Sequence, residues 1–366
     1  MTPVEIELLS ELTIVIPTYN RPLELERAIE YWRDIPVQIF FIDGSEKPWL
    51  PIDVLPSAPN ISYLHVPSKT DQPWFENLSH RFILGSCLPS TKYSAMGAAD
   101  DFYTLSGLIE SLKILESQPK LNAVAGRVLT YERKRSIVWH HKYVARFNRT
   151  DLEVDSIEKK LATRSSWFLY AVCRTEIWQK FLKTCYEEMN FTKANFSAHE
   201  WMLSILSKAM FRTRYLDAIQ QVRQDTIIGW SKGPEVPWDE FICDVRNFCH
   251  IDDITKQLAK GFNEVTPESE HAKNLELARE QMRLEKEKAL GSKTTQQKSR
   301  TFKSVLGNIL FFFLPSLNIF SDRPRRLKYL WRIPKYQYSA QQQKEVEEIE
   351  KLLLKPREEL RLRANI

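Results

Sequence analysis

Two short apolar stretches near the N-terminus, with a helical pattern between them, constrain the fold more than any other feature of this sequence. Leu12 to Pro17 and Val37 to Ile42 are rich in β-branched and aromatic residues, which predicts two buried strands. The segment between them contains Pro22, a residue suited to the first turn of a helix. One face of that segment has the i, i+3, i+4, i+7 apolar spacing of a helix, at Leu25, Ala28, Ile29 and Trp32. A strand, a helix and a strand within about thirty residues predict a parallel βαβ unit.

The alternation of strands and helices continues beyond this unit. Apolar runs predict further strands over Ile61–Val66, Lys92–Ala98, Ala123–Tyr131, Trp167–Cys173 and Tyr215–Val222. Helical patterns occupy Phe75–Leu84, Thr104–Gln118, Thr175–Met189 and His199–Met210. The sequence therefore predicts an α/β fold, with a mixed, mostly parallel, Rossmann-like sheet flanked by helices.

The character of the sequence changes after about Pro237, where charged helical segments replace the alternation. A long charged helix is predicted from Pro267 to Ala289 with Thr266 as its cap, and a last helix from Gln341 to Leu354. The chain has 366 residues, of which 43% are hydrophobic, so it can bury a substantial core. We predict an α/β domain over residues 1–236, a helical extension over 237–290 and a C-terminal region over 291–366.

The C-terminal region combines positive charge with an apolar run. Between residues 292 and 340 there are ten Lys or Arg and one acid, Asp322. Val305 to Phe320 is strongly apolar but is too short, and too interrupted by Pro315, to span a bilayer. This combination favours a segment that lies in a membrane interface. Two alternatives stay open, namely that the apolar run packs into the core and that the basic block binds nucleic acid.

Cysteine usage and the N-terminus bear on location. The five cysteines include no Cys-x-x-Cys pair, which indicates reduced thiols and argues against a zinc site. The first residues have neither the basic nor the apolar segment of a signal peptide. No glycine-rich dinucleotide-binding or P-loop motif occurs. The expected location is the cytoplasm, peripherally at the inner face of a membrane.

Two adjacent carboxylates, Asp100 and Asp101, follow the predicted strand that begins at Lys92. A helical pattern starts immediately afterwards at Thr104, so the pair is expected at the carboxyl end of a strand, where α/β sheets bind ligands. Two hard oxygen ligands suit Mn²⁺ or Mg²⁺, and such an ion can hold a diphosphate. The alternative interpretation is that one of the two aspartates only caps the helix.

Four features in a fixed order carry a resemblance to a known family. They are the run Thr-Ile-Val-Ile-Pro-Thr-Tyr-Asn-Arg-Pro at 13–22, Asp-Gly-Ser at 43–45, the Asp pair, and an acid that heads a helix near residue 200. In these features the chain resembles the family 2 glycosyltransferases of the GT-A fold, and the capsule or O-antigen branch in particular. The resemblance covers Leu12 to Ser231.

The resemblance implies transfer of a single sugar from a nucleotide diphosphate sugar to a hydroxyl acceptor, a glycan or a lipid-linked one, in cell-surface glycan assembly. The family's nucleotide-sugar-binding positions correspond here to Pro17, Thr18, Tyr19, Arg21, Asp43, Ser45, Asn77, Asp100 and Arg223. Among them, Asp43 matches the acid that hydrogen-bonds the base. No nucleic acid is implied beyond the donor nucleotide.

The resemblance also assigns the metal ligands. Asp101 is the first choice for direct ligation, followed by Asp100, and Asp225 stands where the family has a histidine that faces the metal. The family's fuller acidic motif has a further acid where this chain has Ala98 or Ala99, so metal binding depends on fewer ligands. The implied cofactor is Mn²⁺ or Mg²⁺.

Glu200 is the candidate catalytic base. The family places this role on the second acid of a Glu-Asp pair that opens a helix, where this chain has His199-Glu200. An inverting displacement needs one carboxylate to take the acceptor proton while positive charge holds the leaving diphosphate. The alternative for Glu200 is an ordinary acid favoured by the helix dipole. For the whole protein, the alternative is a glycosyltransferase-like membrane assembly partner without activity.

Overall fold

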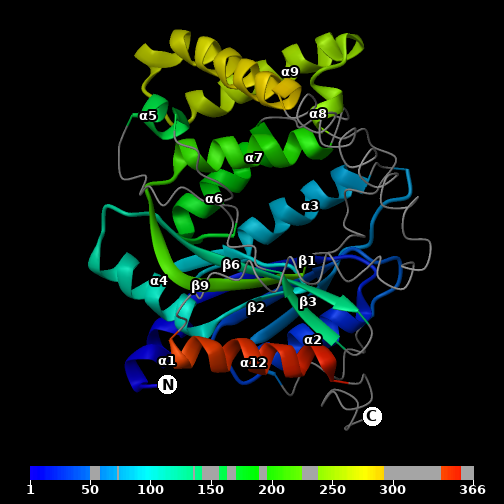
Figure 1. Cartoon of the computed structure of the whole chain (residues 1–366), viewed down its shortest axis with the longest axis vertical. Coiled ribbons are helices and arrows are strands. Elements are labelled where there is room, and N and C mark those ends of the chain that lie inside the picture. The colour runs from blue at the N-terminus through cyan, green and yellow to red at the C-terminus, as the bar shows by residue number, and fades with distance from the viewer. Residues whose placement is uncertain are drawn as a thin grey trace, which may run out of the picture.

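The computed structural model describes residues 1–49, 58–71, 74–134, 137–141, 156–162, 170–188, 196–224, 238–291 and 339–355. One mixed sheet lies between two layers of helices, with a further helical layer outside one of them (Figure 1). Three sequence predictions fall outside the described residues: the position of Asp225, the basic block up to residue 338, and the part of the predicted strand Trp167–Cys173 before Tyr170.

The sheet contains nine described strands in the order β3-β2-β1-β4-β8-β6-β9-β5, with β7 paired to β6. The pairings make six of the nine strands, β1 to β4, β6 and β9, run in the same direction. The expected mixed, mostly parallel sheet of an α/β fold is therefore confirmed. The strands are β1 (Leu12–Thr18), β2 (Gln38–Asp43), β3 (Ile61–His65), β4 (Tyr93–Met96), β5 (Asp101–Tyr103), β6 (Ala123–Lys134), β7 (Ile137–His141), β8 (Val172–Arg174) and β9 (Thr213–Gln224).

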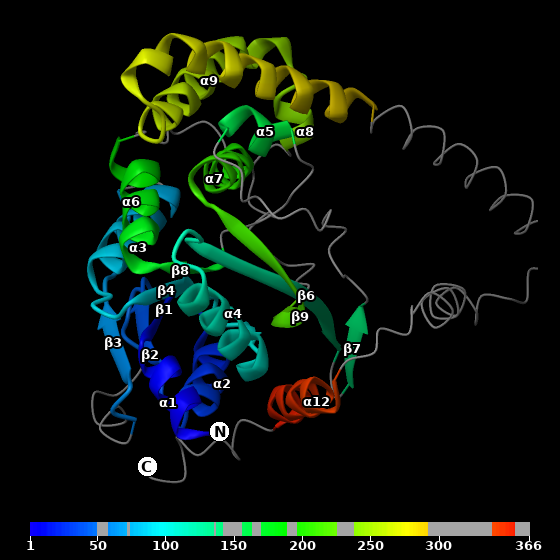
Figure 2. The same cartoon turned by 90° about the vertical axis from the view of Figure 1, so that its left-hand side faces the viewer.

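Helices cover both faces of the sheet. One face carries α3 (Trp74–Cys87), α6 (Thr175–Lys183) and α7 (Phe196–Met210), and the other carries α1 (Pro3–Ser10), α2 (Pro22–Trp32), α4 (Leu105–Ser117) and α12 (Ala340–Leu354) (Figure 2). Beyond α7 lie α5 (Ile157–Ala162), α8 (Trp238–Phe241), α9 (Phe248–Asn263) and a helix over residues 271–291. Shorter turns are the π-helix Thr184–Glu188 and the 3₁₀ helices Val245–Asn247 and Glu268–Glu270.

Side-chain alternation along β1 explains why the sheet needs helices on both sides. Val15 belongs to the core cluster shared with α3, α6 and α7, whereas Ile14 and Ile16 belong to the cluster shared with α2 and α4. Successive strand residues point to opposite faces, so the consecutive apolar residues Ile14, Val15 and Ile16 must be buried on both faces of the sheet. These three consecutive apolar residues in β1 are the sequence signal for burial on both faces.

The structure differs from the sequence prediction at several element boundaries. Helix α1 was not predicted; Thr2 and Glu5 start it with a reciprocal capping box. The short strand β5 was also not predicted, so Asp101 lies inside a strand and not in a loop beyond one. Helix α7 begins at Phe196, which places Glu200 in its second turn. Thr266 is not the N-cap, because Pro267 takes that position before the turn Glu268–Glu270, and the Thr266 hydroxyl donates to the Phe262 carbonyl at 3.0 Å.

The helical segment over residues 238–291 shares the core of the α/β part. Leu258, Phe262, Ala278 and Met282 are buried in the same cluster as Leu206 of α7. Lys208 of α7 is buried as well, and burial, with Lys288 adding to it, lowers its pKa to about 8. The division at residue 237 stays a prediction, but these contacts join the described residues on its two sides. None of the described helices combines the length and apolarity that crossing a membrane requires.

Candidate active site

The ends of three parallel strands place polar residues along one edge of the sheet. In the strand register Thr18 of β1 lies beside Asp43 of β2, and Asp43 lies beside His65 of β3. All three are the last residues of their strands. In open α/β sheets this carboxyl edge is where ligands bind. The predicted nucleotide-binding residues Thr18 and Asp43 are therefore brought together as expected.

Asp43 is the most enclosed acid at this edge, with 1% of its surface exposed. Its Oδ1 accepts from the backbone N–H of Ser45 at 2.9 Å and from the Ser45 hydroxyl at 2.5 Å. The Tyr63 hydroxyl donates to Oδ2 at 2.5 Å. These bonds fix the carboxylate in one orientation and leave Oδ2 with capacity for a further donor. Such a carboxylate is suited to reading an N–H group of a ligand.

Arg81 of α3 lies beside this acid and was missed by the sequence analysis. The side chain is buried, and its Nη1 donates to the Ser68 hydroxyl at 3.0 Å. A Cβ at Gly44 would lie 2.0 Å from that nitrogen, so a side chain at residue 44 would displace the guanidinium from its present position. Burial lowers the pKa of Arg81, and the carboxylate of Asp43 opposes that shift. The available signal was an arginine inside the apolar run of a predicted helix.

Asn77, also on α3, forms two hydrogen bonds with the backbone of Lys69, which follows β3, and is the acceptor in one and the donor in the other. Its Oδ1 accepts from the Lys69 N–H at 2.7 Å, and its Nδ2 donates to the Lys69 carbonyl at 3.0 Å. Asn77 is buried, with 6% of its surface exposed. The residue predicted to bind the nucleotide sugar therefore holds the loop beside Arg81, and its side-chain amide supports the edge of the site through the backbone.

The loop after β1 connects Asp43 with the acidic pair. The Asn20 N–H donates to the Ser45 hydroxyl at 2.9 Å, and Asn20 has a left-handed φ of 52°, which asparagine tolerates. Tyr19 is 39% exposed next to it. Arg21, the next residue after Asn20, reaches across to form an ion pair with Asp100. Pro17 and Thr18 at the end of β1 complete this predicted loop.

Asp101 and Asp100 lie on β5 and immediately before it, and each contacts a guanidinium. Asp101 is 5% exposed, and its Oδ2 lies 3.7 Å from Nε of Arg223. The Gln221 amide approaches the same oxygen at 3.4 Å. These contacts follow from the antiparallel register of β5 and β9, in which Asp101 pairs with Arg223.

The position of Arg223 is restrained by an aromatic ring. Its guanidinium carbon lies 5.2 Å from the ring centroid of Tyr170, a geometry that cation–π attraction stabilises. The side chain is 35% exposed. Arg21 and Arg223 thus place two positive charges beside two carboxylates at the carboxyl edge, and this combination can hold both a cation and a phosphate group.

Asp100 and Asp101 are the described carboxylates that could hold a divalent cation at this edge. In the part of the chain that the structure describes, no group of three or more His, Cys, Asp or Glu side chains is arranged to hold a metal ion. Asp100 and Asp101 are adjacent and offer carboxylate oxygens, which fit a hard ion that keeps waters and phosphate oxygens as its other ligands. The third predicted ligand, Asp225, lies outside the described residues.

The structure describes the backbone of Glu200, as part of α7, but not its side chain. Helix α7 ends at Met210 and β9 starts at Thr213. In Figure 1 the strand runs back beneath the helix, so the N-terminal end of α7 lies on the same side as the carboxyl end of β9. The candidate base is therefore on the side of the molecule that carries Arg223.

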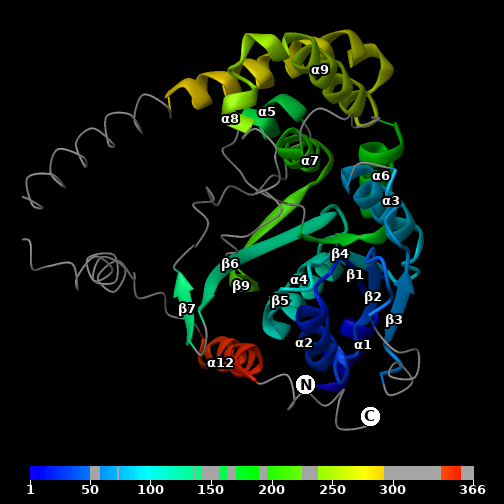
Figure 3. The ribbon, with the colours of Figure 1, turned by 90° about the vertical axis from the view of Figure 1, so that its right-hand side faces the viewer.

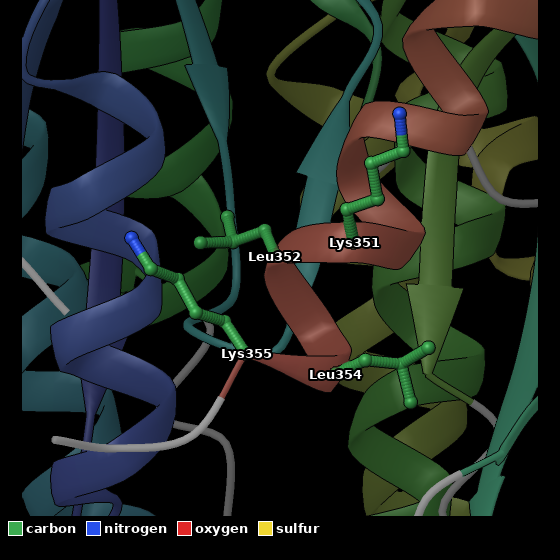
Figure 4. Close-up of a pocket in the computed structure, with 4 residues that line it drawn as sticks. All are labelled: Lys351, Leu352, Leu354 and Lys355. Carbon is green, nitrogen blue, oxygen red and sulfur yellow. The ribbon is translucent and has the colours of Figure 1, made fainter. Parts of the chain in front are cut away.

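A separate pocket lies outside this site. It has a volume of about 530 Å³ and is lined by Lys351, Leu352, Leu354 and Lys355 at the end of α12 (Figure 4). None of its lining residues belongs to the predicted site. The Lys355 side chain extends toward α2, where its Nζ lies 3.1 Å from Glu30.

The described residues thus define an α/β protein with a group of polar residues at the carboxyl edge of its sheet. No known protein-family model matches the sequence, and no curated protein matches it. The chain is similar to solved structures of TarS from S. aureus. The structure of TarS 1–349 in complex with UDP-GlcNAc has 13% sequence identity and a TM-score of 0.47, covering 72% of this chain and 70% of that chain.

Two further TarS structures are similar at a comparable level. TarS 1–349 has 11% identity and a TM-score of 0.44, covering 78% of this chain and 91% of that chain. A third TarS structure has 12% identity and a TM-score of 0.42, covering 74% of this chain and 53% of that chain. A likeness of this size assigns neither an activity nor a ligand to the present chain.

Proposed function

We propose that this protein is an inverting, metal-dependent glycosyltransferase that moves a single sugar from a nucleotide diphosphate sugar to a hydroxyl acceptor. The observation that carries the proposal is the continuity of the carboxyl edge. The enclosed carboxylate of Asp43 is joined through Ser45 and Asn20 to Arg21, and Arg21 is paired with Asp100. A ligand with a base at one end and a diphosphate at the other fits such an edge.

The base end of the donor would lie against Asp43 and Arg81. A carboxylate accepts a base N–H, and a guanidinium donates to a carbonyl oxygen, so the pair recognises a base that presents both groups side by side. Gly44 has no side chain, so the Arg81 guanidinium can occupy the space beside it. The family resemblance at residues 13–22 and 43–45 supports this assignment.

The diphosphate end would lie at the acidic pair. Asp101 and Asp100 would hold Mn²⁺ or Mg²⁺, with Asp225 as the third candidate ligand, and the ion would supply charge stabilisation for the departing diphosphate. Arg223 and Arg21 would contribute positive charge to the same group. Both guanidiniums already lie next to the aspartates that would hold the ion.

Glu200 would act as the general base. The acceptor hydroxyl oxygen forms a bond to the anomeric carbon, the bond from that carbon to the diphosphate oxygen breaks, and the carboxylate of Glu200 takes the hydroxyl proton. Attack from the side opposite the diphosphate inverts the configuration of the anomeric carbon. The placement of the N-terminal end of α7 on the side of Arg223 supports this role.

The donor class can be tested by thermal shift with nucleoside diphosphates and their sugars, with and without Mn²⁺. We expect one nucleotide to stabilise the protein, more strongly with Mn²⁺, by about 3 °C at saturating ligand. Asp43→Asn removes the charge at the base end and should abolish this shift. Asp34→Asn, the same change at an exposed position, should retain it.

A well-folded sample that no nucleotide stabilises would instead favour the second candidate, an inactive glycosyltransferase-like assembly partner. One observation favours that candidate: Ala98 and Ala99 stand where the family's acidic motif is fuller. Slow, Mn²⁺-dependent hydrolysis of the donor would argue against it, because hydrolysis requires a working diphosphate site.

We also propose that the protein is cytoplasmic and binds the inner face of a membrane, where a lipid-linked or other glycan acceptor would be presented. The support is the basic block of residues 292–340 around an apolar run. Replacing Arg325, Arg326 and Lys328 by Gln should weaken binding of the full chain to anionic vesicles by about a hundredfold. Flotation with vesicles of stated composition measures this.

The matched control replaces three exposed lysines of the helix over residues 271–291, Lys273, Lys286 and Lys288, by Gln. It changes net charge equally and should leave flotation nearly unchanged. Binding to an oligonucleotide in place of vesicles, at the same salt concentration, would contradict the membrane proposal.

A further inference from the structure

Helix α12 lies behind the strands that carry the acidic pair. In β5, Asp101 contacts Arg223 and Gln221, whereas the next residue, Phe102, is buried in a cluster that contains residues of α12. In β9, Val222 lies between Gln221 and Arg223 and belongs to the same cluster. Successive strand residues face opposite sides, so the site and α12 occupy opposite faces of the same two strands.

The apolar face of α12 completes this cluster. Val346, Ile349 and Leu353 are 9%, 0% and 3% exposed, and they are buried together with Phe102 and Tyr131. The i, i+3, i+7 spacing of these residues makes one helical stripe. Figures 2 and 3 show α12 against β7 and α2, next to the strands β6 and β9.

Two tyrosines connect this cluster to the backbone of the site through hydrogen bonds from their hydroxyl groups. The Tyr131 hydroxyl donates to the Asp100 carbonyl at 2.9 Å, so a residue of the α12 cluster fixes the main chain of the acidic pair. The Tyr31 hydroxyl of α2 donates to the Tyr103 carbonyl at 2.5 Å, and its ring lies edge-on to Phe102 at 5.2 Å. Burial raises the pKa of Tyr31, and the carboxylates of Glu345 and Glu348 on α12 raise it further.

Both ends of α12 are also held by charged groups. Near its start, the Glu345 carboxylate accepts from the Ser106 hydroxyl at 2.7 Å and from the Ser106 N–H at 3.1 Å. Ser106 is in the first turn of α4, so the carboxylate lies at the positive end of the helix that directly follows β5. At the other end, Lys355 donates to Glu30 of α2 at 3.1 Å.

We infer that α12 is a positioning element of the acidic site, with Glu345 as its main positioning residue. The helix fixes β5 and β9 from behind, so that the two aspartates and Arg223 keep one geometry before a ligand arrives. Residues 340–354 therefore pack as part of the α/β domain and support its acidic site, although more than two hundred residues separate them from Asp101. The nature of the ligand rests on the proposed function, whereas the placement does not.

The test compares two full-length variants, Glu345→Gln and Glu347→Gln. Both remove one negative charge from α12, but Glu347 is exposed and bonds only within the helix, to Gln343, in the contacts that the structure records for it. Amide hydrogen exchange at residues 101–103 and 221–223 reports on the site without any ligand. For Glu345→Gln we expect exchange there to rise about tenfold, the size expected for weakening one charge-assisted bond, with β1 and β2 unchanged.

Binding and turnover supply a second readout. Glu345→Gln should weaken the affinity for Mn²⁺ with nucleotide about tenfold and should lower kcat, whereas Glu347→Gln should match the wild type in both. Glu345→Asp keeps the charge and should recover part of the effect. Equal exchange and equal affinity in Glu345→Gln and Glu347→Gln would overturn the inference, while leaving nucleotide binding by the wild type intact.

Failure of the proposed function gives a different pattern. A wild-type protein that binds no nucleotide would refute the donor assignment, and the exchange comparison would still decide the role of α12. Should Glu345→Gln fold poorly, Ile349→Val removes one methyl group from the buried stripe and tests the same coupling. The quantity compared is the change in exchange rate between wild type and Ile349→Val. A larger rise at the amide of Phe102 than at the amide of Phe41 of β2 would support the coupling, and equal changes at the two amides would oppose it.

Discussion

Replacement of Asp101 by alanine should abolish sugar transfer, with a loss of at least about 10³-fold in kcat. Asp101 is the most enclosed member of the acidic pair, and its carboxylate faces Arg223 at 3.7 Å. Removing it takes away a proposed metal ligand and one carboxylate oxygen beside Arg223. The measurement is the initial rate of transfer with saturating donor and Mn²⁺.

The fold should survive this change, because Arg223 is 35% exposed and can be solvated. Asp217→Ala serves as the control, since Asp217 also lies on β9 but its side chain is 70% exposed. We expect it to retain nearly full activity. A rate for Asp101→Ala within threefold of that control would remove the acidic pair from the mechanism.

Glu200→Gln should lower kcat by about 10² to 10⁴-fold while leaving donor binding intact, because it removes a general base but keeps the size of the side chain. The thermal shift with nucleotide and Mn²⁺ should equal that of the wild type. Steady-state kinetics should show the loss in kcat and an unchanged KM for the donor. This split separates a base from a residue that binds the donor.

The control for Glu200 addresses its alternative interpretation as an acid favoured by the helix dipole. Glu176 is an exposed acid in the first turn of α6, so Glu176→Gln removes one negative charge near the start of another helix, where the dipole effect is strongest. It should leave transfer unchanged. If Glu200→Gln also turned over normally, the base assignment would be wrong, and another group near the end of β9 would have to take the acceptor proton.

Local pattern in the sequence was sufficient for most of the fold. The double-sided apolar run of β1, the helical spacing of α2 and the run of β2 each depend on neighbours a few residues away, and such patterns persist whatever the rest of the chain does. The same holds for the placement of Asp43 at the end of β2, whereas Asp101 lies inside β5 and not beyond the end of a strand. The start of α7 was misplaced by three residues, although Asn195, a residue type favoured at a helix N-cap, directly precedes Phe196 in the sequence.

The candidate site was only partly accessible from the sequence. Arg81 was missed because its role depends on how α3 lies over the turn at Gly44, which is a contact between separate elements. β5 was missed because three residues carry no periodicity, and its existence depends on pairing with β9 more than a hundred residues later. The pairing of Arg223 with Asp101 follows from the same long-range register, and the ion pair of Arg21 with Asp100 joins the loop after β1 to the start of β5.

Helix α12 shows most clearly which features the sequence determined and which the tertiary structure decided. The sequence by itself determined that Val346, Ile349 and Leu353 form one apolar stripe, since a stripe is a property of helical spacing alone. Only the tertiary structure decided that the stripe covers Phe102, Tyr131 and Val222, because several apolar surfaces were available to it. Burial against the site strands, with Glu345 at the start of α4, selects one of them, and that choice makes the C-terminal helix part of the site's support.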